Sequence, residues 1–446
     1  MLTRRAPHFL CITSILVLCP FTFQAFSQSN EKPKLSNFGS SLERLKWNAE
    51  RQATIETKRK DTQSKRSDSE EVVRVETSLV VSDVLVLDQQ GRAVQGLTAK
   101  DFVLTEEGKA QSVGMFSLGD NVSVARSIVL IIDYSCMQLP FLQTSVDAAK
   151  TLIDKLGPWD RMAIITDDVE LLVNYTNNHR KLKDGLDVLL KRTWLVGHNT
   201  LAETQERHLP FGRGFQYSAL MAVLKEAFND EDVRPIVVFQ TQGTEAHILQ
   251  KPIILPPNPT GLTPDMKTEM DRGAKRHQEY MRRNKREFSL SDVYKAAEKS
   301  RATIYTVVPG FRLIGLSVDE QIAQMRALND QVIVLPWISK RTRQENLNLP
   351  RDILRWEAED MLNLQSALAV LSTITGGWIE FLNQPSQADQ IYSRIFSDIN
   401  RRYLVGYYPT NKEHDGKRRK IIIEVREHPE YIVMGRKAYY APGPDW

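Results

Sequence analysis

Residues 72–116 alternate apolar and polar side chains with a period of two, which is typical of β-strands that bury one face. Turn-forming stretches around Gly91 and Gly108 interrupt this alternation. The pattern predicts a small all-β module over residues 72–120. A module this short has too few strands to close a sandwich by itself.

From residue 126 the pattern changes to continuous apolar runs, each followed by a segment of helical periodicity. The run SIVLIID at residues 127–133 is typical of a strand that is buried on both faces of a parallel sheet. Leu142, Val146 and Ala149 then recur on one face at helical spacing. Because strands and helices go on alternating, we predict a doubly wound, mostly parallel α/β sheet with helices on both faces over residues 126–401.

The last segment, residues 402–442, returns to the β pattern, with three predicted strands. Neither this segment nor the N-terminal module is large enough to build a core alone. We therefore predict that the two pair into one small β-sandwich-like domain. The α/β domain would then be inserted between its two halves.

The N-terminus has the pattern of an export signal over residues 1–27. Arg4 and Arg5 precede a mostly apolar run at residues 9–23, and small residues follow at the expected cleavage position. The run is shorter than the ~20 residues of a membrane-spanning helix, so a retained anchor is the less favoured alternative. We expect an exported chain, periplasmic or secreted, without a transmembrane segment after cleavage. Residues 28–70 are polar and predict a linker or a solvated helix.

Charge and cysteine content narrow the classes of function. The net charge of +4 includes Arg4 and Arg5, so the rest of the chain is nearly balanced and indicates no nucleic-acid partner. Cys136 is the one cysteine outside the signal, which excludes an internal disulfide in the mature chain.

Catalytic motifs are missing from the sequence. It has no Gly-x-Ser-x-Gly, His-Glu-x-x-His, phosphate-loop or Cys-x-x-Cys pattern. We therefore predict a protein that is not an enzyme. The alternative from another class is a hydrolase or a thiol-based redox protein that uses Cys136 or a pair of histidines.

A set of motifs resembles one protein family. The chain carries VLDQQGRAVQGLTAKDFVLTEEG before the α/β segment, TGGWIEF near its end, and RRYLVGYYP and GKRRKIIIEV after it. With these flanks, residues 72–442 are similar to the bacterial VWFA-related proteins common in acidobacteria. Residues 126–400 resemble a von Willebrand factor type A domain. The resemblance implies a protein-binding module of the adhesion type.

The resemblance also implies a metal-ion-dependent adhesion site at the carboxyl ends of the strands. In that family the first loop reads Asp-x-Ser-x-Ser, the second loop adds a threonine, and the third adds an aspartate. These hard oxygen ligands suit Mg²⁺. Asp133 and Ser135 match the first loop, but Met137, Gly214 and Gln242 stand at the other three positions. The site is therefore degenerate.

A degenerate site predicts protein binding through the carboxyl-end face without a tightly bound metal, so no cofactor is expected. The alternative is a Mg²⁺- or Mn²⁺-dependent adhesion domain that binds an acidic residue of its partner. Asp133 and Ser135 would then hold the ion together with surrogate oxygens, for which the candidates are Thr200, Thr241, Thr244 and Glu245. A third interpretation is that Asp133 only caps a turn.

Two connections, residues 245–290 and 309–359, are longer than this fold requires. Each follows a predicted strand, so both emerge at the carboxyl end of the sheet. The first contains the basic stretch KTEMDRGAKRHQEYMRRNKRE, which indicates a basic face for an acidic partner; a solvated helix is the alternative interpretation. The second contains the apolar stretch VIVLPWI. The candidates for partner binding in these insertions are Arg276, Arg282, Arg283 and Trp337.

Overall fold

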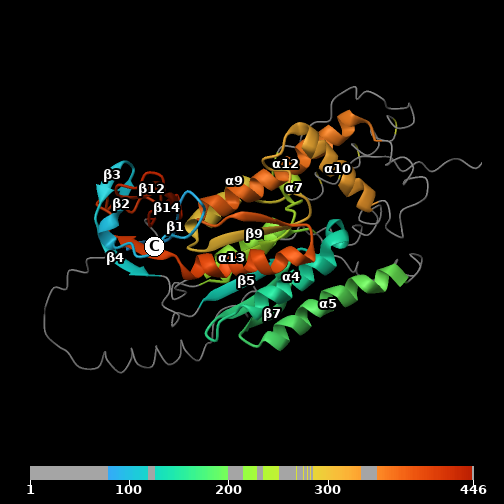
Figure 1. Ribbon diagram of the computed structural model, residues 1–446, viewed down its shortest axis with the longest axis horizontal. Helices are drawn as coiled ribbons and strands as arrows, with labels where there is room; N and C mark the ends of the chain where they lie inside the picture. Colours follow the sequence, from blue (N-terminus) through green and yellow to red (C-terminus); the bar gives the residue numbers. More distant parts are fainter. Residues whose placement is uncertain are drawn as a thin grey trace, which may run out of the picture.

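The computed structural model describes most of the chain downstream of residue 78. The described residues are 79–118, 126–198, 214–228, 235–250, 268, 275, 279, 282, 285–332 and 349–443. They form a six-stranded sheet covered by helices, and two four-stranded sheets lie beside one end of it (Figure 1).

The six-stranded sheet has the order β10-β9-β8-β5-β6-β7. All neighbouring strands are parallel except β6 and β7, which form an antiparallel hairpin at one edge. The prediction of a mostly parallel α/β sheet is therefore confirmed. The strands are β5 (Ser127–Ile132), β6 (Arg161–Thr166), β7 (Leu171–Thr176), β8 (Pro235–Gln240), β9 (Thr303–Pro309) and β10 (Ile379–Leu382).

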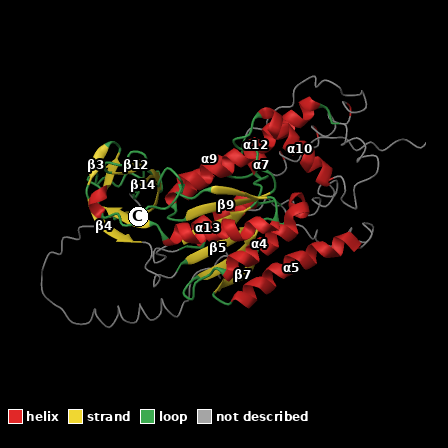
Figure 2. Cartoon of the chain, viewed as in Figure 1, coloured by secondary structure: helices red, strands yellow, loops and turns green. Residues whose placement is uncertain are grey.

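Helices cover both faces of this sheet (Figure 2). The central strand β5 is buried from Ile128 to Ile132, because its side chains contribute to the cores on both faces. One face carries α4 (Leu142–Asp154), α5 (His179–His198) and α13 (Ala388–Asn400). The other carries α6 (Gln216–Glu226), α9 (Leu290–Lys299) and α12 (Arg351–Ile374).

The second insertion is partly helical, which the sequence pattern did not predict. Helix α10 (Val318–Val332) packs against the first turns of α12, and α12 begins at Arg351, inside the connection predicted over residues 309–359. The two helices form a hairpin with its own apolar cluster, which also contacts Phe141 in the 3-10 turn η6 (Cys136–Phe141) after β5. The cluster consists of Phe141, Leu313, Ile322, Met325, Leu328, Leu349, Ile353, Leu354 and Ala358.

Strands from the two ends of the chain share both of the smaller sheets. One sheet has the order β13-β1-β11-β4 and the other β14-β12-β2-β3. Strand β14 is additional to the three C-terminal strands that the sequence predicted, and its three residues are too few to show an alternating pattern. The bounds are β1 (Val80–Leu87), β2 (Phe102–Glu106), β3 (Lys109–Gln111), β4 (Val113–Leu118), β11 (Tyr403–Tyr407), β12 (Arg418–Val425), β13 (Ile432–Met434) and β14 (Ala438–Tyr440).

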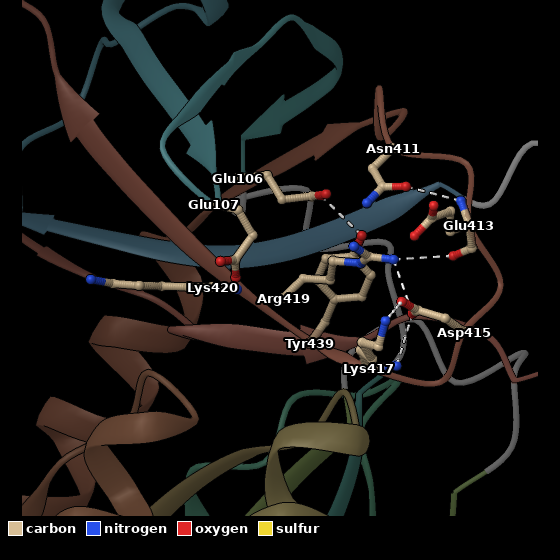
Figure 3. A network of polar contacts seen from close by, with 9 residues as sticks. All are labelled: Glu106, Glu107, Asn411, Glu413, Asp415, Lys417, Arg419, Lys420 and Tyr439. Carbon is tan, nitrogen blue, oxygen red and sulfur yellow. Dashed lines mark hydrogen bonds and ion pairs between the residues drawn. The ribbon is translucent and has the colours of Figure 1, made fainter.

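A buried carboxylate connects these two sheets. Glu106 of β2 is 2% exposed, and its Oε2 accepts hydrogen bonds from the hydroxyls of Tyr407 at 2.7 Å and Tyr439 at 2.9 Å. Beside it, Arg419 donates to Asp415 at 3.0 Å and so fixes the turn before β12 (Figure 3). Burial, and secondarily the bond to Glu106, raise the pKa of the Tyr407 hydroxyl, which therefore remains a donor.

The smaller sheets dock on the amino ends of the parallel strands through Arg402. This arginine is 1% exposed. It donates hydrogen bonds to the hydroxyl of Tyr305 at 3.1 Å, to the carbonyl of Asp83 at 3.1 Å and to the carbonyl of Gly376 at 2.6 Å. Because Asp83 belongs to β1 while Tyr305 belongs to β9, one side chain joins the two parts of the molecule.

We expect Arg402→Met to lower the free energy of unfolding by about 3 kcal/mol or more, because the buried carbonyl of Gly376 and the partly buried carbonyl of Asp83 lose their donor. Urea unfolding of the purified variant measures this change. The neighbouring, exposed Arg401→Met is the matched control and should stay within about 0.5 kcal/mol of the wild type. Equal midpoints for the two variants would contradict the role of Arg402.

Candidate functional site

Three loops meet at the carboxyl end of β5, where the sequence predicted the site. The first loop follows β5 and contains Asp133, the second ends at Gly214 before α6, and the third follows β8 from Thr241. Open α/β sheets bind ligands at this position, because loops from neighbouring strands meet there. The α10–α12 hairpin contacts the first loop through Phe141.

The carboxylate of Asp133 joins all three loops. It is 2% exposed. Its Oδ1 accepts a hydrogen bond from the backbone N–H of Ser135 at 3.0 Å. Its Oδ2 accepts two, from Thr241 Oγ1 at 2.7 Å and from Gln216 Nε2 at 2.9 Å. The protein thus provides donors to both oxygens of the residue that matches the metal-site aspartate.

Gln216 is a residue of this site that the sequence analysis missed. Its Nε2 donates to Thr244 Oγ1 at 3.0 Å as well as to Asp133, and its Oε1 accepts from the backbone N–H of Glu245 at 2.9 Å. The sequence analysis placed Gly214, two residues earlier, at the position of the second-loop threonine. A signal was present, since Gln216 is a polar residue at the start of the largely apolar helix α6 and is fully buried there.

A second buried carboxylate, Asp167, was also missed. It follows β6 and is 0% exposed. Its Oδ1 accepts from the backbone N–H of Tyr134 at 3.1 Å, and its Oδ2 accepts from the N–H of Gly214 at 2.8 Å. The available signal was its position directly after an apolar strand, like that of Asp133. Asp167 therefore fixes the second loop against the first.

The two buried carboxylates favour retention of a proton. Burial raises the pKa of Asp133, although hydrogen bonds partly offset this rise. Burial also raises the pKa of Asp167, well above its usual range, and the charges of Asp133 and Asp168 raise it further. Within the described residues, neither carboxylate forms an ion pair with a lysine or an arginine. Both carboxylates therefore bind a proton more tightly than exposed aspartates do.

The remaining candidates of the third loop make their bonds within the protein. Gln242 donates from Nε2 to the carbonyl of Pro309 at 3.0 Å, so its amide group binds the end of β9. Glu245 accepts from Arg286 Nε at 2.6 Å, from Ser218 Oγ at 2.6 Å and from the Ser218 N–H at 2.9 Å. The guanidinium of Arg286 also stacks over the ring of Phe215, 4.3 Å from its centroid. Thr241 and Thr244 are bonded to Asp133 and Gln216, as described above.

Several predicted residues are not placed by the structure. Thr200, Arg276, Arg283 and Trp337 lie outside the described residues, as does the side chain of Met137. Arg282 lies at an exposed position in a helical segment.

The oxygen ligands described at this site do not fit a magnesium ion. Mg²⁺ demands a near-octahedral set of about six oxygens, several of which are usually water. Ser135 Oγ, at a position implied by the family, is buried and has no hydrogen-bond partner of normal geometry in the described part of the chain, although it lies close enough to Asp133 to offset part of the rise that burial causes in the pKa of that carboxyl. Both oxygens of Asp133 already accept protein hydrogen bonds. Within the described ranges, no group of three or more His, Cys, Asp or Glu side chains is arranged to hold a metal.

A buried polar cluster lies between the helical hairpin and the segment after the third loop. His247, in the short helix α7 (Ala246–Leu249), is bonded through Nε2 to Asp360 of α12 at 2.8 Å. Glu357, one turn earlier on α12, accepts from Asn329 of α10 at 3.5 Å. His247 Nδ1 is buried and has no hydrogen-bond partner among the described residues.

Comparison with known proteins finds low similarity to solved structures. No protein-family model and no curated protein matches the chain. The conserved hypothetical protein BatB from Bacteroides thetaiotaomicron is 13% identical with a TM-score of 0.29, and the match covers 62% of this chain and 98% of that one. A von Willebrand factor type A protein from Catenulispora acidiphila is 8% identical with a TM-score of 0.30, covering 83% and 76%. The vWF domain of the type V pili tip protein Mfa5 from Porphyromonas gingivalis is 10% identical with a TM-score of 0.30, covering 62% and 95%.

Superpositions with TM-scores this low do not establish a shared fold. The mixed α/β arrangement is consistent with a von Willebrand factor A-like domain because of its strand order, its antiparallel edge strand and its helices on both faces.

We expect Gln216→Ala to lower the free energy of unfolding by about 2–4 kcal/mol, because a buried carboxylate loses a donor and the Glu245 N–H loses its acceptor. At pH 7, Gln216→Glu should lower the free energy of unfolding more than Gln216→Ala does, since it adds a carboxylate beside Asp133. At pH 5 the loss caused by Gln216→Glu should be smaller than its loss at pH 7. Urea unfolding at both pH values measures the difference. Gln390→Glu, at an exposed position of α13, is the charge-matched control. A Gln216→Glu variant that is as stable as the wild type would contradict this geometry.

The free energy of unfolding should depend on pH through the buried side chain of Glu357. Burial, with a smaller contribution from the charge of Asp360, raises its pKa from 4.5 to about 7. Because the folded-state pKa exceeds the unfolded one, this stabilising contribution is fully present below about pH 4.5 and is lost as the pH rises through about 7. Glu357→Gln stays neutral, so between pH 5 and pH 8.5 it should lose about 2–3 kcal/mol less stability than the wild type. Urea unfolding at the two pH values tests this, with the exposed Glu359→Gln as control; identical pH profiles for the two variants would refute it.

Proposed function

We propose that this chain is an exported, non-enzymatic protein-binding module of the VWFA-related type, which recognises its partner without a tightly bound metal. The observation that carries the proposal is the saturation of Asp133 by donors from all three loops, with the Gln216 amide between Asp133 and Thr244. Such a network stabilises the loops in the way that a metal ion would, while it leaves no open position for the partner's carboxylate.

The binding surface is the carboxyl end of the sheet. The α10–α12 hairpin adds an apolar cluster of its own at this end, and the first insertion begins immediately after α7. Long connections on a rigid scaffold are common sites of recognition. We assign partner contacts to these added segments, including Arg282 at its exposed position.

Export is supported by the pattern at residues 1–27. In the described part of the chain, no helix combines the length and the apolar character that crossing a membrane requires.

A metal-dependent adhesion domain is the second candidate, and two observations favour it. Ser135 Oγ is buried without a hydrogen-bond partner of normal geometry in the described residues, and the neighbouring pair Asp133 and Asp167 would be neutralised by a cation. In that case Asp133 and Ser135 would hold Mg²⁺ or Mn²⁺, and Gln216 would have to move away from Asp133.

Thermal unfolding separates the two candidates, because an ion that binds only the folded state raises the midpoint by mass action. We expect the midpoint of the wild type to change by less than about 1 °C between 5 mM MgCl₂ or MnCl₂ and EDTA, in line with metal binding weaker than millimolar. Asp133→Asn, which keeps the size of the side chain, should show the same insensitivity. A rise of several degrees that Asp133→Asn abolishes would establish the metal-dependent candidate instead.

Partner binding tests the function itself. Proteins from the native envelope fraction that are retained on the immobilised chain should be retained equally in EDTA and in Mg²⁺. The exposed-residue variant Arg282→Glu should weaken retention, while Arg180→Glu on the distant helix α5 should not. Retention that requires Mg²⁺, or that neither variant changes, would argue against this surface.

A further inference from the structure

A cluster of positively charged residues lies near the junction of the two parts, at the end of the molecule away from the candidate site. Two lysines of α9, Lys295 and Lys299, stand one helical turn apart, with their Nζ atoms 5.6 Å and 5.3 Å from the ring centroid of Tyr440 in β14. Tyr440 is paired in register with Arg418 of β12. Lys420 lies two residues further along β12, on the same face of the sheet as Arg418.

The arginines near this junction are used within the protein. Arg418 binds Glu298 of α9 through two hydrogen bonds, of 2.7 Å and 2.6 Å. Arg419 binds Asp415. Arg436 donates hydrogen bonds to the backbone carbonyls of Glu298, in α9, and Ser300, just after it. These contacts account for docking between the sheets and α9, so the arginines have a structural role.

The three lysines differ from these arginines. Lys295, Lys299 and Lys420 are exposed, and no carboxylate in the described residues forms an ion pair with them. Lys420 points away from the network of Glu106, Arg419 and Asp415 (Figure 3). The neighbouring acidic groups are already engaged: Glu298 is bound to Arg418, and Glu107 accepts from the backbone N–H of Lys420. Asp292, one turn before Lys295 on α9, accepts from the backbone N–H and the hydroxyl of Ser289; these bonds lower its pKa, and the charge of Lys295 helps to lower it further. We call Lys295, Lys299, Lys420 and Tyr440 the lysine surface.

We propose that the lysine surface is a second protein-binding site, which takes an acidic segment of a partner polypeptide. Free ammonium groups provide the charge complementarity, and they bind carboxylates without the fixed two-pronged geometry of arginine. The exposed Ile422, two residues beyond Lys420 on the same face of β12, offers apolar contact to the segment.

A membrane surface is a weaker match for the same residues. Attachment to anionic lipids typically uses clusters of about four to eight basic residues, and here three lysines are free. This site is independent of the proposed carboxyl-end surface, and the chain would accordingly hold two partners at opposite ends.

The test uses fluorescence anisotropy with a labelled twelve-residue peptide of alternating glutamate and serine, titrated with the full chain. We expect binding at 50 mM NaCl that weakens at least tenfold at 300 mM NaCl, because the contacts are exposed ion pairs. Lys295→Gln combined with Lys299→Gln should weaken binding at least fivefold. Lys181→Gln combined with Lys191→Gln, which removes the same charge from exposed positions of α5, should leave it within twofold.

Three results would overturn the proposal. The first is equal affinity for a control peptide in which glutamine replaces glutamate. The second is equal weakening by the two lysine pairs, which would indicate a general effect of net charge. The third is binding to phosphatidylglycerol vesicles without binding to the peptide, which would assign the surface to lipid. None of these results depends on metal or on the loops around Asp133, so they leave the first proposed function unaffected.

Discussion

A carboxylate that is removed from water must be satisfied by donors, and this constraint organises the carboxyl end of the sheet. Strand β5 delivers Asp133 into a position that is 2% exposed, where an unpaired charge would cost several kcal/mol. The chain meets the constraint with a backbone N–H of the first loop, the Gln216 amide and the Thr241 hydroxyl. Asp167 extends the network to the backbone of Tyr134 and Gly214. As a result, the loops that would hold a metal in the related fold are fixed by one another.

The two ends of the α/β domain have separate roles. At the amino ends of the strands, Arg402 joins β1, β9 and the segment before β10, so the smaller sheets are held against the domain by buried hydrogen bonds. At the carboxyl ends, the helical hairpin packs its own apolar cluster against Phe141 of the first loop. The polar cluster at His247 and Glu357 connects that hairpin to α7, and through it to the third loop. A rigid base and an elaborated opposite face are the arrangement expected of a recognition module.

Periodicity was sufficient to predict the central sheet, its helices and the return to β structure, because burial on two faces leaves a strong apolar signal in strands such as β5. The same signal fails where an element is short or locally polar. Strand β14 has three residues, and the first turns of α12 contain Arg351, Asp352, Arg355 and Trp356 between the apolar positions that pack on α10. The pattern there resembles a loop.

The sequence was sufficient to locate the candidate site but not to predict which side chains form its hydrogen bonds. Asp133 and Ser135 were identified from their position after β5. Gln216 was not, because the bond that defines its role joins residues 83 positions apart. Asp167 is likewise defined by its contact with Gly214, 47 residues away. No local pattern records which distant side chain lies beside a buried carboxylate, so the hydrogen bonds of Asp133 and Asp167 could be found only from three-dimensional contacts.

The most direct test of this account is anomalous diffraction from crystals grown in 10 mM MnCl₂, measured at the manganese edge. We expect no anomalous peak beside Asp133 and Ser135, and we expect the Gln216 amide to lie within hydrogen-bond distance of the Asp133 carboxylate. An anomalous peak coordinated by Ser135 Oγ, with Gln216 turned away, would contradict it and would show that the site binds metal despite Met137, Gly214 and Gln242.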